Sequence, residues 1–142
     1  MPGYSGTPLA KKLGIKDDFR IALLHVPADV KTELSEAFAK CRIMRLSGPG
    51  FSDLNFIFLL AKSRAGLELE LWPAAKALAP AGMLWIAWPK KSSGVATDLT
   101  EDVVRQSGLD AGLVDIKVCA VTEVWSGLKF VIPVKNRPKA KR

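Results

Sequence analysis

The sequence is short of the residues on which most metal and redox sites depend. Only 2 of its 142 residues are cysteine and only 1 is histidine. Cys41 and Cys119 stand 78 positions apart, so the chain has neither a CxxC redox motif nor the spacing of a metal-ligand pair. The single imidazole, His25, excludes a histidine-rich metal site and any mechanism that needs two imidazoles. We therefore expect both cysteines to be buried thiols and His25 to be a hydrogen-bonded structural residue, with catalysis as its alternative role.

Long apolar segments are also missing. The longest runs, such as 56–61, have 6 residues, far below the roughly 18 that a membrane-spanning helix needs. Residues 1–8 lack the apolar centre of a secretory signal, which predicts a cytoplasmic protein. What remains is an ordinary globular composition, with 49% hydrophobic and 25% charged residues, and it suits one domain. We assign that domain to residues 1–134.

The positive charge is concentrated at the end of the chain. The formal net charge is +7, but residues 135–142 hold 5 of the 21 basic residues and no acid. The rest of the chain has 16 basic and 14 acidic residues, which is an ordinary balance. We expect 135–142 to be a disordered basic tail that attracts phosphate groups weakly and without reading a sequence. A role as a nucleic-acid accessory protein acting through this tail is therefore one alternative function.

Helical and strand patterns alternate along the chain. Continuous apolar runs predict buried strands, while Asp29 and Asp98 are placed to cap helices and Gly108 to end one. We expect helices at 7–14, 29–38, 67–78 and 99–106, and strands at 20–26, 41–46, 53–61, 83–88, 114–121 and 125–134. The last two strands are joined by about three residues, which only an antiparallel hairpin allows. The sequence thus predicts a single doubly wound α/β sheet, mostly parallel, with helices on both faces and a C-terminal antiparallel β-hairpin.

Two features of this sequence resemble features of a known protein family. The segment 79–85, Ala-Pro-Ala-Gly-Met-Leu-Trp, resembles the turn before the fifth strand of S-adenosylmethionine-dependent methyltransferases, and the hairpin after Gly112 resembles the end of their sheet. The resemblance spans about residues 20–134 and implies a truncated methyltransferase-like Rossmann fold.

The motifs that bind the usual cofactors of such folds are absent. A dinucleotide or S-adenosylmethionine site needs glycines after the first strand and commonly an acid at the end of the second. Here the first turn reads His-Val-Pro-Ala-Asp at 25–29, and the second strand ends near Arg45. Arg45 would suit a 2′-phosphate, but the glycine turn that a phosphorylated dinucleotide requires is missing. The cofactor is therefore unknown.

A second resemblance covers nearly the whole chain except the tail. The segments 3–14, 88–100 and 112–121 are similar to those of a family of small bacterial proteins of unknown function. This resemblance implies a bacterial origin and brings no activity, cofactor or catalytic residue with it.

The carboxyl ends of the predicted strands supply the candidate site, because ligands of open α/β sheets bind there. Cations and hydroxyls follow two of these strands, and together they would form a rim for an anion or a phosphorylated metabolite. The set is Lys62, Ser63, Arg64, Lys90, Lys91, Ser92, Ser93 and Thr97. The competing interpretation is that these charges merely solvate the strand ends.

No catalytic set can be assembled from the sequence. We therefore favour a non-catalytic protein that binds a small anion at this rim. The alternative is an enzyme, either a divergent S-adenosylmethionine-dependent methyltransferase or a small transferase that uses His25. Oligomeric state cannot be read from the sequence.

Overall fold

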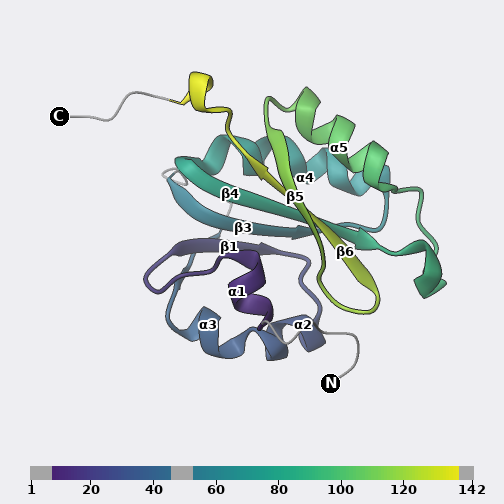
Figure 1. Ribbon diagram of the computed structural model, residues 1–142, viewed down its shortest axis with the longest axis horizontal. Coiled ribbons are helices and arrows are strands. Elements are labelled where there is room, and N and C mark those ends of the chain that lie inside the picture. Colours follow the sequence, from purple (N-terminus) through teal and green to yellow (C-terminus); the bar gives the residue numbers. More distant parts are fainter. Residues whose placement is uncertain (1–7, 46–52, 138–142) are drawn as a thin grey trace.

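The fold is a six-stranded sheet with helices on both sides (Figure 1). The computed structural model describes residues 8–45 and 53–137. The strands, in the spatial order β2-β1-β3-β4-β6-β5, are β1 Arg20–Leu24, β2 Arg42–Ile43, β3 Leu54–Leu60, β4 Leu78–Pro89, β5 Val114–Ala120 and β6 Trp125–Val131. The helices are α1 Leu9–Leu13, α2 Ala28–Glu33, α3 Ser35–Ala39, α4 Arg64–Ala77 and α5 Glu101–Asp110, with 3-10 turns η1 at Lys91–Ser93 and η2 at Val134–Asn136.

The strand pairing confirms the predicted fold class. Strands β2, β1, β3 and β4 are mutually parallel, and β6 and β5 follow as an antiparallel hairpin on the edge of β4. The chain passes from β1 outward to β2 and then returns across β1 to β3. The strand order therefore reverses between β1 and β3, which is where open α/β sheets bind their ligands.

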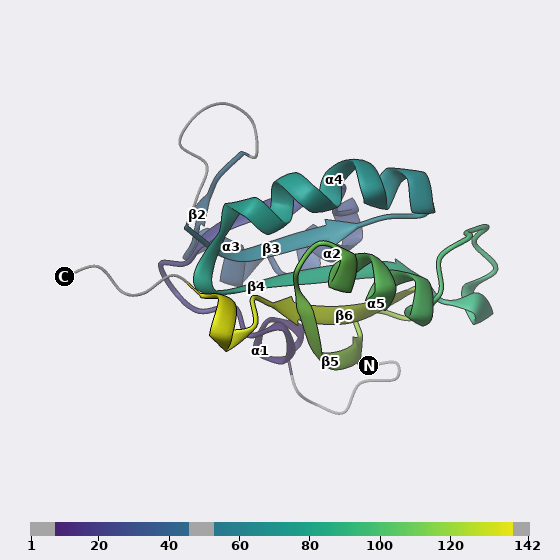
Figure 2. The ribbon, with the colours of Figure 1, turned by 90° about the horizontal axis from the view of Figure 1, so that it is seen from above.

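Two apolar cores lie on the two faces of the sheet. Helices α4 and α5 bury Leu67, Leu71 and Val104 against one face, and α1, α2 and α3 bury side chains such as Leu13 and Val30 against the other (Figure 2). The central strands β3 and β4 are buried almost throughout, as continuous apolar runs in a parallel sheet predict.

The start of the chain differs from the prediction in its caps. Helix α1 ends as expected at Gly14, which has φ +83°, while Thr7, the first residue of the helix predicted at 7–14, lies outside the described residues. Strand β1 stops at Leu24 because His25 has φ +60°, a left-handed conformation that a strand cannot continue. Asp29 does not cap a helix: it lies in the first turn of α2, and Pro27 holds the cap position without a side-chain hydrogen bond. The strand predicted at 41–46 shrinks to two residues.

In the second half of the chain, the structure differs from the prediction at two helix ends. Strand β4 begins at Leu78, so the start of the segment 79–85, for which the resemblance implied a turn before the strand, lies inside a strand whose register against β3 shifts. Helix α5 is capped by Thr100, whose hydroxyl accepts a hydrogen bond from the Val103 amide at 3.2 Å, and not by Asp98. Gly108 lies inside α5 and does not end it. Arg105 of α5 ties the helix to β5 through Asp115, at 2.9 Å.

Membrane-spanning helices, metal-binding clusters and the basic tail are the remaining features that the described residues bear on. Among residues 8–45 and 53–137, no helix is long and apolar enough to cross a membrane. The same residues contain no cluster of histidine, cysteine or acidic side chains that could hold a metal ion. Of the predicted tail, only 135–137 are described, partly in η2, and the remainder lies outside the described residues, as does Leu46, the last residue of the strand predicted at 41–46.

Candidate functional site

A cavity of about 380 Å³ opens where the strand order reverses. This volume falls within the range of about 300–1,000 Å³ typical of small-molecule sites. Its walls come from the carboxyl ends of β1 and β3, from the first turn of α4 and from the start of β6. The lining residues are His25, Pro27, Leu60, Ala61, Lys62, Gly66 and Trp125. The sequence predicted two of them as site residues, His25 and Lys62.

His25 is held at the mouth of the cavity by helix α4. Its Nε2 atom lies 3.0 Å from Oε2 of Glu70, and its side chain is 67% exposed. The left-handed backbone turns the chain sharply after β1, and such a conformation is uncommon for a residue other than glycine. His25 is thus hydrogen bonded, as predicted, but it is not buried in the core. Its partner lies 45 positions away, so no local pattern in the sequence could have identified Glu70.

Lys62 is the cation that lines the cavity. It follows β3 directly, and its carbonyl accepts a hydrogen bond from Oγ1 of Thr97 at 2.6 Å. Among the described residues, no carboxylate lies within ion-pair distance of Lys62. An unneutralised cation at a cavity of this size favours an anionic ligand.

Backbone amides in the first turn of α4 already donate hydrogen bonds to side chains of the same chain. Oδ1 of Asp98 accepts a hydrogen bond from the Arg64 amide at 2.7 Å, and Oγ of Ser63 accepts one from the Gly66 amide at 3.0 Å. The Arg64 side chain pairs with Glu68 at 3.5 Å. Two of the amide groups that could have met an external anion here therefore already bind an internal carboxylate and a hydroxyl. Asp98, predicted to cap its own helix, instead joins the segment before α5 to α4.

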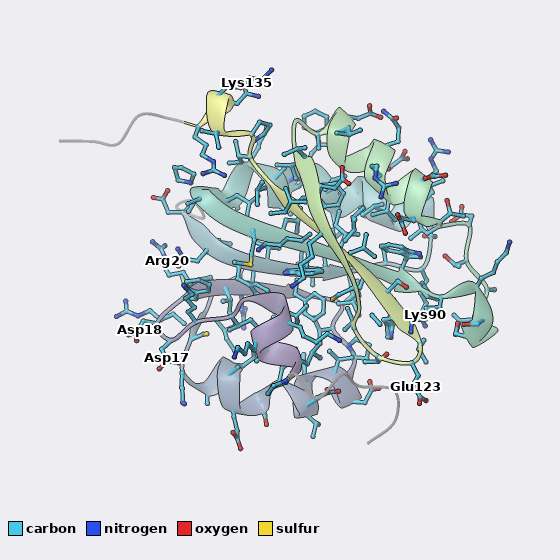
Figure 3. The ribbon with its side chains drawn as sticks, in the orientation of Figure 1. Asp17, Asp18, Arg20, Lys90, Glu123 and Lys135 are labelled. Atoms are coloured by element: carbon cyan, nitrogen blue, oxygen red, sulfur yellow. The ribbon has the colours of Figure 1, made fainter. Side chains whose placement is uncertain are left out.

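The second predicted group, 90–93, lies beside the hairpin connection (Figure 3). The Lys90 amide donates to the Val124 carbonyl at 2.7 Å, and Oγ of Ser93 donates to the Lys90 carbonyl at 2.6 Å. Lys91 and Ser92 are exposed in η1. None of these residues lines the cavity, although Pro89 is opposite Trp125 in the sheet and Trp125 does. The structure thus joins 62–64 to 97–98 and places 90–93 on a neighbouring loop.

Neither thiol offers a nucleophile, although both cysteines are partly buried and not fully buried as predicted. Burial raises the pKa of the Cys119 thiol, although Lys12 and Lys117 nearby oppose the rise. Burial likewise raises the pKa of Cys41, whose Sγ atom donates toward the carbonyls of Lys16 and Ala37. Both groups therefore stay protonated at neutral pH, and a protonated thiol reacts poorly.

The site also departs from the usual way in which this kind of fold holds an adenosyl or dinucleotide cofactor. Helix α2 begins at Ala28, so only three residues separate it from β1, and none of them is glycine. Beyond β2 the described residues are Met44 and Arg45, with no acid to bind a ribose. The described residues at the two strand ends therefore do not fit that cofactor in its usual pose.

Comparison with known proteins establishes the fold and nothing finer. No protein-family model and no curated protein matches the sequence. Among solved structures, a methyltransferase from Aquifex aeolicus described as S-adenosylmethionine-dependent is similar at a TM-score of 0.64 and 14% identity, over 87% of this chain and 88% of that one.

Two other solved structures extend the comparison. Precorrin-6y C5,15-methyltransferase from Geobacter metallireducens aligns at a TM-score of 0.60 and 14% identity, over 88% and 86% of the two chains. A protein described as a pericyclic reaction enzyme aligns at 0.54 and 14%, over 89% of this chain and 47% of that one. The chain therefore has a methyltransferase-like Rossmann fold, and this fold hosts more than one chemistry.

Proposed function

We propose that this protein binds a small anion, such as a phosphate monoester, in the cavity between the ends of β1 and β3, and that it does so without catalysis. The observation that carries the proposal is Lys62, a cation without a carboxylate partner among the described residues, at a cavity placed on the strand reversal. His25 adds a ring nitrogen at the cavity mouth. The side chains that line the cavity include no hydroxyl, thiol or carboxylate, which supports binding over reaction.

The proposal predicts that charge at position 62 decides affinity. Lys62→Met keeps most of the apolar stem and removes the ammonium group, so affinity for adenosine 5′-monophosphate or inorganic phosphate should fall about tenfold or more, the equivalent of about 1.4 kcal/mol or more. Thermal-shift titration checks this, because a ligand at 100 times its Kd stabilises the folded state by about 2.7 kcal/mol.

Lys76→Met is the matched control, since Lys76 is exposed in the last turn of α4, at the opposite end from the cavity. It should leave both titrations unchanged. Equal affinity in the wild type and Lys62→Met would remove the basis of the proposal, and so would the absence of any shift at millimolar ligand.

A second candidate function is a divergent S-adenosylmethionine-dependent methyltransferase. What favours it is that structural neighbours at similar chain length are described as methyltransferases. What opposes it is the turn after β1, which has no glycine, and the lack of an acid at Met44 and Arg45, the described residues that directly follow β2.

Calorimetric titration separates these candidates. Because the usual cofactor contacts are missing, we expect no heat of binding from S-adenosylmethionine or S-adenosylhomocysteine at millimolar concentration. Saturable binding of either compound with a Kd in the micromolar range would make the methyltransferase the better proposal.

The remaining expectations stay predictions. They are a cytoplasmic location, a relationship to small bacterial proteins of unknown function, and weak nucleic-acid binding through residues 135–142.

A further inference from the structure

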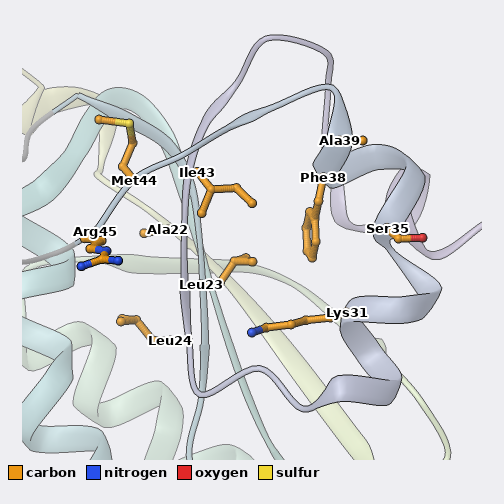
Figure 4. A pocket seen from close by; sticks show the side chains of 10 residues that line it. All are labelled: Ala22, Leu23, Leu24, Lys31, Ser35, Phe38, Ala39, Ile43, Met44 and Arg45. Carbon is orange, nitrogen blue, oxygen red and sulfur yellow. The ribbon is translucent and has the colours of Figure 1, made fainter.

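A second and larger cavity, of about 560 Å³, lies on the β2 side of β1, away from β3. Figure 4 shows the side chains that line it. It is bounded by the second half of β1, by the residues that end and follow β2, and by helices α2 and α3. The function proposed above does not use it, because the two cavities have no lining residue in common.

The shortness of β2 explains why this cavity exists. Strand β2 pairs with β1 only at Arg20 and Ile21, so the described part of β2 does not cover the rest of β1. The apolar side chains of Leu23 and Leu24 consequently border an open groove instead of a neighbouring strand. Ile43 is 58% exposed although it is apolar and lines the same groove. Phe38 of α3 closes the far wall with its ring (Figure 4).

Two cations stand at this apolar groove. Lys31 reaches in from α2 with its amino group toward the β1 side chains, and the guanidinium of Arg45 lies across the groove from it (Figure 4). None of the described residues that line the cavity is acidic. Within the described ranges, neither Lys31 nor Arg45 has a carboxylate within ion-pair distance. A ligand that fits must therefore combine an apolar body with negative charge.

We propose that this groove binds a small amphipathic carboxylate, with an aliphatic or aromatic body against Leu23, Phe38 and Ile43 and its carboxylate on Arg45 and Lys31. Guanidinium and ammonium groups both form strong charge-assisted hydrogen bonds to carboxylates, and the apolar walls reward burial of the body in proportion to its area. A ribose-bearing ligand is disfavoured, since the described lining of the groove offers no acid to its hydroxyls.

Octanoate and 1-octanol test this proposal directly, because they share a chain and differ in charge. Both are titrated into ¹⁵N-labelled full-length protein, and amide shifts report the site. Octanoate should shift the amides of Leu23, Phe38 and Ile43 saturably, and 1-octanol should bind at least tenfold more weakly. Equal binding of the two, or octanoate shifts that lie elsewhere, would overturn the proposal.

Variants separate the two parts of the site. Combined Lys31→Met and Arg45→Met should weaken octanoate binding at least tenfold, and Ala39→Trp should block it by filling the groove while both charges remain. Arg42→Met is the matched control, since Arg42 is exposed on β2 and does not line the cavity. Unchanged binding in the charge variant or in Ala39→Trp would contradict the assignment. Lys62→Met should leave octanoate binding intact, so this proposal and the one for the first cavity can fail independently.

Discussion

Replacing Trp85 by alanine should lower the free energy of unfolding by about 4 kcal/mol, within the range for truncating a buried aromatic side chain. Trp85 is completely buried at the centre of β4 and belongs to the core beneath α1, α2 and α3. Its Nε1 atom also donates to the Leu13 carbonyl at 2.8 Å, near the end of α1. The alanine variant would lose both the buried ring and the hydrogen bond that fastens α1 to the sheet.

Trp85→Phe separates the contribution of the hydrogen bond from that of the buried ring, and Trp72→Ala serves as the control. Trp85→Phe keeps most of the apolar body and removes the donor, so we expect a loss of about 1–2 kcal/mol and faster hydrogen exchange in α1. Trp72 is 52% exposed on α4, and Trp72→Ala should therefore change stability by no more than about 0.5 kcal/mol. Urea denaturation measures all three variants. A loss below about 2 kcal/mol for Trp85→Ala would show that the core closes around the missing ring.

The sheet was predictable because its central strands are encoded locally. The continuous apolar runs that became β3 and β4 are typical of strands in the middle of a covered parallel sheet, where both faces are buried. The short connection after β5 likewise leaves only an antiparallel pairing. For such elements the pattern of a few neighbouring residues decides the structure.

Helix ends were harder, because several residues near each end compete for the same role. Asp98 and Thr100 both carry capping oxygens, and the sequence does not show that Thr100 caps α5 while Asp98 reaches the Arg64 amide 34 positions away. Gly108 looked like a helix stop because glycine commonly follows a helix. Gly108 instead lies inside α5 and packs against the ring of Phe130 on β6, a contact that the neighbouring sequence does not show.

The candidate site could likewise be predicted only in part. The strand ends located His25 and Lys62, since the ends of neighbouring parallel strands must meet at one edge of the sheet. The sequence did not identify Glu70 and Trp125, because tertiary packing brings Glu70 to the site and the register of the hairpin brings Trp125 there. The hydroxyls of Ser93 and Thr97 were expected to serve a ligand, yet both donate to backbone carbonyls of the chain.

Gly108→Ala should destabilise the protein by about 2 kcal/mol, although alanine is the better helix former by about 1 kcal/mol. A Cβ atom at this position would overlap the Cε1, Cζ and Cδ1 atoms of the Phe130 ring. Phe130 is fully buried on β6, so its ring can move aside only by disturbing the core around it. Overpacking typically costs about 1–3 kcal/mol and occasionally more, and three overlapping ring atoms place this cost at about 3 kcal/mol, which exceeds the gain in helix propensity by about 2 kcal/mol.

Phe130→Leu identifies the cause by removing the atoms that collide. In that background Gly108→Ala should be neutral or stabilising, because only the helix propensity remains, and the coupling in a double-mutant cycle should reach about 2–3 kcal/mol. Leu109→Ala, at the neighbouring 43% exposed position of the same helix, controls for changes in α5 itself and should have little effect. Urea unfolding of the four cycle members measures the coupling. If Gly108→Ala stabilises the wild-type background, α5 can move away from β6, and the close packing between them does not limit stability.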